Sequence, residues 1–181
     1  MPRKPAFSPL VFLPYSSRDN VPKDAVVIDV SSYADPPWCT FSPMWAHCGI
    51  PVPGMPGQTS DSVEGVWQGL KVIRGQTAPR LFRGKGQKRG GKPSGHQLGT
   101  RLLDVVEARL KIYRPTYKWM LQHRVAPALI EELVARALRG VTQYVHDVGD
   151  NGDINNTNEP LAHAALVVQY VNRLCQQCVT G

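Results

Sequence analysis

The sequence lacks a long hydrophobic run. The apolar stretch after the basic residues 1–4 is short and is interrupted by Pro9 and Pro14. A membrane helix needs about 20 apolar residues and a signal peptide needs a continuous apolar region, so we expect neither. With 181 residues, of which 42% are hydrophobic, the chain can bury a sizeable core without cross-links. These features predict a cytoplasmic protein with no membrane partner.

Cysteines are few, and their spacing does not suit a zinc ribbon. The chain has four, with eight residues between Cys39 and Cys48, whereas Cys175 and Cys178 fall in the last turns of a predicted helix. A zinc ribbon uses two closely spaced cysteine pairs. We therefore expect reduced thiols, as is usual in the cytosol, with no metal and no cofactor.

Acidic residues are absent from residues 65–103, although nine Lys and Arg residues lie there. The glycine-rich part, residues 83–96, exposes backbone N–H groups between cations, and such a loop can hold phosphates. It is not a Walker loop, because the required G-x-x-x-x-G-K-[ST] sequence is missing. Together with the net charge of +7 of the whole chain, this loop predicts a polyanionic partner, either nucleic acid or a phosphorylated small molecule. The alternative is a solvated loop that only raises solubility.

A helix is predicted over residues 59–73. Its start is marked by Asp61 followed by Glu64, a pattern related to the capping box, with Ser60 or Thr59 as alternative N-caps. One face of the helix is apolar. A second face carries a file of polar residues with 3, 4, 3 spacing: Asp61, Glu64, Gln68 and Lys71. This file predicts one wall of an active site, and the alternative is the solvated side of an amphipathic helix.

Two interior glycines, Gly65 and Gly69, lie one turn apart in this predicted helix. Each glycine costs the helix about 1 kcal/mol relative to alanine. Their presence indicates that another backbone or a ligand comes close to the helix at this point.

The segment 147–156 carries Asp147, Asp150 and Asp153 between a predicted strand and a predicted helix. It fails as a calcium loop, because the third position would be Gly149 and the twelfth, which needs a bidentate Glu, would be Asn158. Catalytic carboxylates are common in such loops. The alternative is that these residues only form turns.

Hydrophobic periodicity and breakers predict an α+β fold, a helix-rich single domain with a few short strands. Residues 1–24 hold five prolines and are expected to form an irregular N-terminal arm, so the domain would span residues 25–181. Strands are predicted at residues 25–30 and 141–146, and residues 50–54 are expected to form an edge strand or a turn. Further helices are predicted at 98–113, 115–124, 127–138 and 160–176.

Parts of the sequence resemble the NADAR proteins. Phe41-Ser42-Pro43 and Ile50-Pro51-Val52-Pro53-Gly54 precede residues 62–71, as a Phe-Ser-Asn-Phe-like element and a short strand precede a Glu-His-x-Phe-Gln-x-x-Lys helix in that family. Three positions of the helix match: Glu64, Gln68 and Lys71. Trp67 stands in place of the family's aromatic residue. The region 117–121 and the loop at 150–153 resemble later parts of the family, whereas Gly65 replaces the family's histidine and the usual Trp-Gly is missing from the loop.

This resemblance implies a NADAR-like domain with N-glycosidase activity on ribose-linked compounds. Some members cleave phosphoribosylamino-pyrimidines, and others remove ADP-ribose from guanine bases in nucleic acid. The implied partner is a phosphorylated ribose-containing small molecule or ADP-ribosylated nucleic acid. The implied catalytic residues are Glu64, Lys71, Asp150 and Asp153. The implied substrate-binding residues are Phe41, Trp67, Gln68, Arg83, Lys85, Lys88, Arg89 and Trp119.

The tryptophans Trp38, Trp67 and Trp119 are candidates for stacking on a base, although large aromatic residues at helical spacing usually belong to a core.

A second interpretation of the whole chain also stays open. In it the protein is a non-catalytic module that binds nucleic acid or a nucleotide through the basic glycine-rich loop.

Overall fold

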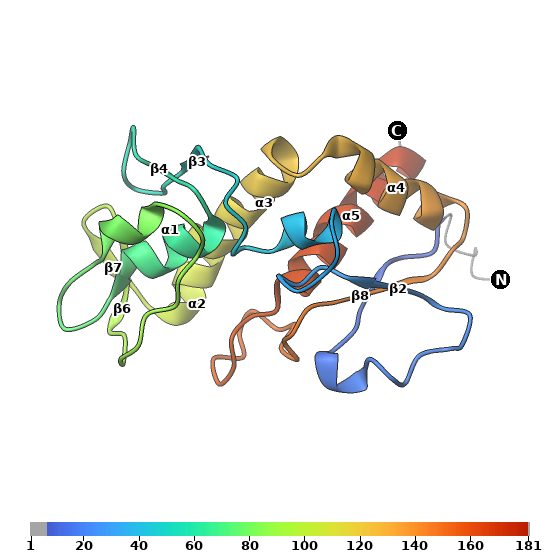
Figure 1. The fold of residues 1–181 in the computed structure, drawn as a ribbon, viewed down its shortest axis with the longest axis horizontal. Coiled ribbons are helices and arrows are strands. Elements are labelled where there is room, and N and C mark those ends of the chain that lie inside the picture. The colour runs from blue at the N-terminus through green and yellow to red at the C-terminus, as the bar shows by residue number, and fades with distance from the viewer. Residues whose placement is uncertain (1–6, 181) are drawn as a thin grey trace. The chain divides into compact units, whose positions relative to one another are not determined.

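The computed structural model describes residues 7–180, and it confirms a mixed fold of helices and strands, shown in Figure 1. By their contacts, the residues form two compact units. The first unit combines the described residues up to Thr40 with Val125–Asp153 and the described residues from Glu159 onward. The second unit comprises Phe41–Arg124 and Ile154–Asn158. Within residues 7–180, no helix combines the length and the apolar character needed to cross a membrane.

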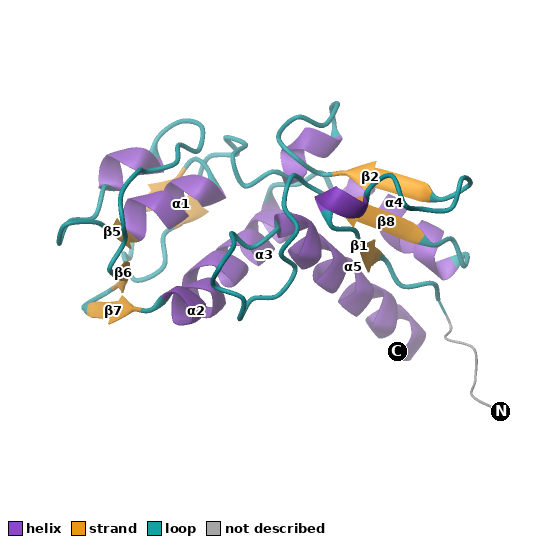
Figure 2. Ribbon diagram, turned by 90° about the horizontal axis from the view of Figure 1, so that it is seen from below, coloured by secondary structure: helices purple, strands orange, loops and turns teal. Residues whose placement is uncertain are grey.

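The first unit is built on a parallel sheet in which β8 (Gln143–His146) lies between β1 (Val11–Phe12) and β2 (Val26–Asp29), as Figure 2 shows. Its helices are α4 (Pro127–Leu138) and α5 (His163–Thr180). The predicted strands at 25–30 and 141–146 and the predicted helices at 127–138 and 160–176 are thus confirmed within a few residues at each end.

The segment 1–24 is less irregular than expected where it is described. It contributes β1, in which Val11 pairs with Tyr144, and a 3-10 turn at Tyr15–Ser17. Leu10 and Leu13 are both buried. These residues therefore belong to the first unit rather than forming a separate arm, because the sheet supplies partners for their backbone groups.

The second unit contains α1 (Val63–Leu70) and two small antiparallel sheets. One sheet pairs β3 (Ile50–Pro51) with β4 (Thr59–Ser60). The other has the order β5 (Lys71–Val72), β6 (Gly95–Leu98), β7 (Arg101–Leu103). A long helical segment follows, formed by α2 (Val105–Ala108), a π-helical turn at Arg109–Tyr113 and α3 (Arg114–His123). Figure 2 shows α2 and α3 running on in one direction.

The helix predicted over residues 98–113 is wrong in its first part. The chain turns at Gly99, which has a positive φ of 57°, and residues on both sides of this turn are strands β6 and β7. The helix begins only after Asp104, whose side chain accepts a hydrogen bond from the Glu107 N–H at 2.8 Å. The next helix, predicted over residues 115–124, is confirmed as α3, which follows directly on the π-helical turn and has Pro115 in its first turn, a position that suits proline.

Candidate functional site

Helix α1 is shorter than predicted and has a different N-cap. Ser62 caps it, since its Oγ accepts a hydrogen bond from the Gly65 N–H at 3.0 Å. The expected caps Thr59 and Ser60 lie in β4 instead. Asp61 is also outside the helix, and its Oδ2 accepts a hydrogen bond from the Gly84 N–H at 2.7 Å. The sequence offered four neighbouring residues that are all good caps, so propensity alone did not select Ser62.

The predicted polar file is therefore only partly helical. Asp61 precedes α1 and Lys71 opens β5, so only Glu64 and Gln68 share a helix face. Both side chains are buried, and Gln68 Nε2 donates to Glu64 Oε1 at 2.7 Å. A buried, hydrogen-bonded carboxylate and amide are not the solvated side of an amphipathic helix, so this alternative is wrong for these two residues.

The close approach expected at the two glycines of α1 is confirmed. A Cβ added at Gly65 would lie 2.6 Å from the Leu81 carbonyl oxygen, and one added at Gly69 would collide with the ring of Phe82. Both contacts come from a 3-10 turn at Pro79–Phe82. The glycines therefore let this turn pack directly against α1, with a backbone carbonyl at Gly65 and a phenyl ring at Gly69.

The basic glycine-rich loop passes directly against the Glu64 side chain. Gly86 is buried, its N–H donates to the Met44 carbonyl at 3.1 Å, and a Cβ added to it would lie 2.5 Å from the Glu64 Cβ. The backbone N–H of Glu64 in turn donates to the Pro43 carbonyl at 2.8 Å. The backbone of Glu64 is thus held by a hydrogen bond and its side chain by packing, which positions its carboxylate beside Gln68.

Arg89 is used differently from the expectation. Its guanidinium donates to the Gln68 carbonyl at 3.3 Å, to the Lys71 carbonyl and to the Gln76 carbonyl at 3.3 Å. Its backbone N–H donates to Gln68 Oε1 at 3.2 Å. Carbonyls at the end of a helix lack intrahelical partners, and a cation there is favourable. Arg89 therefore holds the loop to the end of α1, which leaves its donors little capacity for a phosphate.

The other three predicted phosphate ligands are exposed: Arg83, Lys85 and Lys88. Arg83 lies 3.6 Å from Asp61 in a surface ion pair in which its side chain is 66% exposed. Pairs of this kind are weak, so the guanidinium can exchange its partner for a ligand anion. The exposed loop cations thus remain suitable for binding phosphate.

Lys71 lies at the junction of α1 and β5, close to these groups. Burial lowers the pKa of its amino group, and the positive charges of Arg89 and Lys88 lower it further, while the Glu64 carboxylate acts in the opposite direction. An amine with a lowered pKa is a better nucleophile at neutral pH. The lowered pKa is a property that a nucleophilic role of Lys71 requires.

His96 is a residue of this site that sequence reasoning missed. It pairs in register with Lys71 across β5 and β6, so the two side chains lie on the same face. The imidazole is buried, and neither ring nitrogen has a hydrogen-bond partner within residues 7–180. Burial, and then the Lys71 charge, lower its pKa from 6.5 to about 3, so it is neutral. The only signal was a histidine at the end of the glycine-rich loop.

The aromatic residues predicted to bind substrate are largely occupied by protein contacts. Trp67 lies 3.7 Å from His96 between ring centroids, and its other neighbour Tyr113 meets it edge-on at 5.4 Å. Phe41 is fully buried, and its carbonyl accepts a hydrogen bond from the Tyr117 hydroxyl at 2.6 Å. Phe41 therefore belongs to the core, whereas the Trp67 ring is half-buried and packs on His96 and Tyr113, in part as the alternative interpretation expected.

Trp119 is partly exposed on α3, but neighbours on the same helix and just beyond it contact its ring. The His123 ring stacks on it at 4.5 Å, and the Arg124 guanidinium lies 5.0 Å from its centroid. A base would have to displace one of these groups to stack there.

The acidic loop does not join the other predicted catalytic residues in one compact unit. Asp150 and Asp153 are exposed and belong to the first unit, whereas Glu64 and Lys71 belong to the second. Asp150 Oδ1 accepts a hydrogen bond from the Ser16 N–H at 2.8 Å, as expected of a turn-forming residue.

The next part of the acidic loop, Ile154–Asn158, belongs to the second unit. Arg109 is buried there and donates to the Ile154 carbonyl at 2.9 Å and to the Asn156 carbonyl at 2.6 Å. Arg109 opens the π-helical turn, a feature often found at functional sites.

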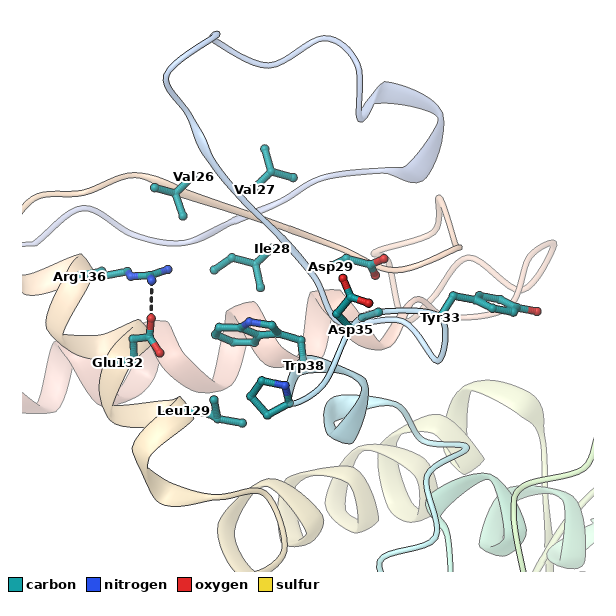
Figure 3. A pocket seen from close by; sticks show the side chains of 12 residues that line it. Val26, Val27, Ile28, Asp29, Tyr33, Asp35, Trp38, Leu129, Glu132 and Arg136 are labelled. Carbon is teal, nitrogen blue, oxygen red and sulfur yellow. Dashed lines mark hydrogen bonds and ion pairs between the residues drawn. The ribbon is translucent and has the colours of Figure 1, made fainter.

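A pocket of about 430 Å³ lies in the first unit, and its lining includes none of the residues predicted to be catalytic (Figure 3). It is lined by β2, by α4 and by the loop that follows β2. Of the tryptophans considered for base stacking, Trp38 lines this pocket.

Comparison with known families gives one match. The sequence profile described as "Family of unknown function (DUF6939)" matches residues 15–167. The chain belongs to this family. The match includes α1, the basic loop and the acidic loop that precedes α5. Neither the curated proteins nor the solved structures include a match to this member of the family.

Proposed function

We propose that the protein is a hydrolase that cleaves the N-glycosidic bond of an ADP-ribosyl or phosphoribosyl compound, including ADP-ribose attached to a nucleobase in DNA. The observation that carries this proposal is the buried pair of Glu64 and Gln68 beside Lys71, whose pKa is lowered. Functional sites are where burial and neighbouring charges shift the pKa of reactive groups. The resemblance of these three positions to the NADAR helix supports the same chemistry.

Glu64 would act on the charge that develops during bond cleavage. As the C1–N bond breaks, its electron pair leaves with the nitrogen and positive charge builds on C1 and the ring oxygen. A carboxylate held by Gln68 stabilises that charge without having to reorganise. The leaving nitrogen takes up a proton, and a water molecule supplies the hydroxyl that ends on C1.

Lys71 offers a covalent route for the same bond. Its neutral amine attacks C1, the base leaves with a proton, and opening of the sugar ring gives an iminium ion between C1 and Nζ. Water then adds to that carbon, and the amine departs as the ribosyl product is released. The exposed cations Arg83, Lys85 and Lys88 would bind the phosphate groups of the substrate.

The second candidate is a non-catalytic module that binds nucleic acid or a nucleotide. The exposed cations of the basic loop favour it, together with the absence of acidic residues from positions 65–103. The two functions respond to different substitutions. A binding module loses affinity when Lys85 and Lys88 are neutralised and keeps it when Lys71 is replaced.

The test incubates the purified protein with three substrates and measures released base by mass spectrometry. These are ADP-ribosylated guanine DNA, an ADP-ribosyl nucleoside and a phosphoribosylamino-pyrimidine. We expect release from at least one, and a loss of about 100-fold or more in Glu64→Gln and Lys71→Met, since positioned acid–base groups contribute about 10²–10⁴. Lys118→Met, at an exposed position of α3, is the control. Tight DNA binding without release from any substrate would instead establish the binding module.

Borohydride trapping separates the covalent route from direct attack by water. Reduction during turnover should attach the sugar to Lys71, and a tryptic peptide containing this residue should gain the corresponding mass. An active enzyme in which Lys71 stays unlabelled would exclude the iminium and leave Glu64-assisted attack by water.

A further inference from the structure

The pocket of the first unit has the size and the walls of a small-molecule site. Its volume of about 430 Å³ falls within the range of about 300–1,000 Å³ that ligand sites occupy. Figure 3 shows the Trp38 indole in the middle of the lining, with Ile28 on one side and Leu129 on the other. Pro37 and Val26 extend this apolar wall. A flat apolar group can therefore pack along the indole.

The charges in the lining are opposite to those of the whole chain. Three carboxylates line the pocket, from Asp29, Asp35 and Glu132, and the one cation in the lining is Arg136. Arg136 is paired with Glu132 one helical turn away. The remaining two carboxylates make the pocket negative in a chain whose net charge is +7. Such a pocket attracts cations and repels the phosphate groups that suit the basic loop.

The segment that carries the two aspartates is fixed by hydrogen bonds of the local backbone. Asp29 ends β2, and its Oδ1 accepts a hydrogen bond from the Ser31 N–H at 2.7 Å. The Ser31 carbonyl accepts a hydrogen bond from the Ala34 N–H at 3.2 Å, and the Asp35 carbonyl accepts one from the Trp38 N–H at 2.9 Å. Consecutive turns therefore carry both carboxylates and the indole, which reduces the entropy that a ligand would have to overcome on binding.

We propose that this pocket binds a small organic cation, in which an ammonium group is attached to a flat apolar body. The ammonium lies between the carboxylates of Asp29 and Asp35, and the body packs on the Trp38 indole. Charge–carboxylate contacts and stacking on a tryptophan are the interactions that favour such ligands. The lining includes none of the proposed N-glycosidase residues, and occupancy of the pocket does not depend on that activity.

The two carboxylates are not equally suitable for mutagenesis. Asp29 also orients the turn through Ser31, and its Oδ1 lies 4.0 Å from His146 Nδ1. Asp35 is exposed. Asp35→Asn therefore removes a charge from the pocket with the smaller effect on the fold. Asp24→Asn is the matched control, because Asp24 is an exposed aspartate of the same unit outside the lining.

The experiment titrates the full chain with phenethylamine and with phenethyl alcohol, which has the same body but no charge. Binding is followed by calorimetry and by the NMR signal of the Trp38 indole N–H, assigned with Trp38→Phe. We expect saturable binding of the amine, at least tenfold weaker binding of the alcohol, and at least tenfold weaker amine binding in Asp35→Asn. Asp24→Asn should bind the amine as the wild type does.

Three results would overturn the proposal. Equal affinity for the amine and the alcohol would show that charge does not select the ligand. If Asp35→Asn and Asp24→Asn weakened amine binding equally, the effect would come from the net charge of the protein rather than from a contact in the pocket. An absence of binding by wild-type protein, with a circular dichroism spectrum that shows it folded, would exclude the site altogether.

Discussion

The start of α5 and the β5–β6 pair each bury a histidine near a charged residue, but they differ in whether the ring nitrogens have hydrogen-bond partners. At α5, His163 Nδ1 lies 2.8 Å from Asp147 Oδ2, and its Nε2 lies 2.7 Å from the Val30 carbonyl oxygen. In the β5–β6 pair, both nitrogens of His96 lack a hydrogen-bond partner among residues 7–180. One imidazole is fully satisfied and the other is not.

The aspartate at α5 is satisfied as well. Burial alone would raise the pKa of Asp147, but the hydrogen bond and the charge of His163, with N–H bonds from Ala164 and Gly149, lower it. Buried polar groups are normally hydrogen-bonded, and one that is not needs an explanation such as a missing water or ligand. We infer that Asp147 and His163 belong to the framework, and that His96 belongs with Lys71 in the candidate site.

The largest effect is expected from breaking the satisfied pair. Asp147→Ala removes the carboxylate that His163 Nδ1 contacts inside the protein, and that carboxylate also accepts the Ala164 N–H at the start of α5. Breaking a buried ion pair costs about 3–5 kcal/mol, and we expect a loss of this size in the free energy of unfolding, measured with urea. Asp150→Ala, which removes one exposed hydrogen bond to Ser16, should cost less than about 1 kcal/mol. Equal losses in the two variants would contradict the assignment of Asp147 to the framework.

The unsatisfied histidine should show itself in the pH dependence of stability. His96 has a pKa of about 3 in the folded state and 6.5 as its usual value, so between these pH values the unfolded state binds the extra proton. Stability then falls as the pH falls, by about 1.4 kcal/mol per pH unit and by about 2 kcal/mol between pH 7 and pH 5. His96→Phe keeps a ring against Trp67 and should lose this dependence.

Urea unfolding at pH 7, 6 and 5 measures that difference. The control is His123→Phe, which changes an exposed histidine on α3 and should leave the slope as in the wild type. Parallel curves for wild type and His96→Phe would show that His96 accepts a proton in the folded state, and the contrast with His163 would then disappear.

Much of the fold was predictable because it depends on local patterns. Three of the four residues of β2 are β-branched, and α4 begins at Pro127, which suits a first helical turn. The strands β6 and β7 were missed, because their hydrophobic residues also fit a helical period and the turn at Gly99 was not recognised. The mixed fold class follows from the sequence, whereas the grouping into two units depends on long-range contacts.

The candidate site was less predictable, because its important contacts join distant residues. The sequence identified Glu64, Gln68 and Lys71, yet it placed them on a single helix, whereas Lys71 lies on β5. It assigned Arg89 to phosphate, since a list of charges does not show that a guanidinium faces the end of α1. His96 acquires its role only through pairing with Lys71, which no local pattern encodes.

A smaller effect should follow from moving the basic loop off Glu64. Gly86→Ala places a Cβ 2.5 Å from the Glu64 Cβ, and the backbone must shift to relieve it. We expect a loss of about 1–2 kcal/mol in unfolding free energy, as for other overpacking changes, and faster hydrogen exchange of the Gly86 N–H that donates to Met44. Gly90→Ala is matched to it, since a Cβ there meets no atom within 4 Å. If both alanines act alike, the loop does not pack against Glu64.

The smallest effect concerns the exposed pair of Arg83 and Asp61, which is satisfied but not buried. The Arg83 side chain is 66% exposed, and exposed ion pairs contribute about 0–1 kcal/mol, so Arg83→Ala should change the urea midpoint very little. Asp61→Ala should cost more, about 1 kcal/mol, because its Oδ2 also accepts the Gly84 N–H that fixes the start of the loop. The ratio of the two losses in unfolding free energy tests whether a charged residue stabilises the fold more through its hydrogen bonds or through its burial. If Arg83→Ala cost as much as Asp147→Ala, burial would not be the property that separates framework pairs from those that a ligand can replace.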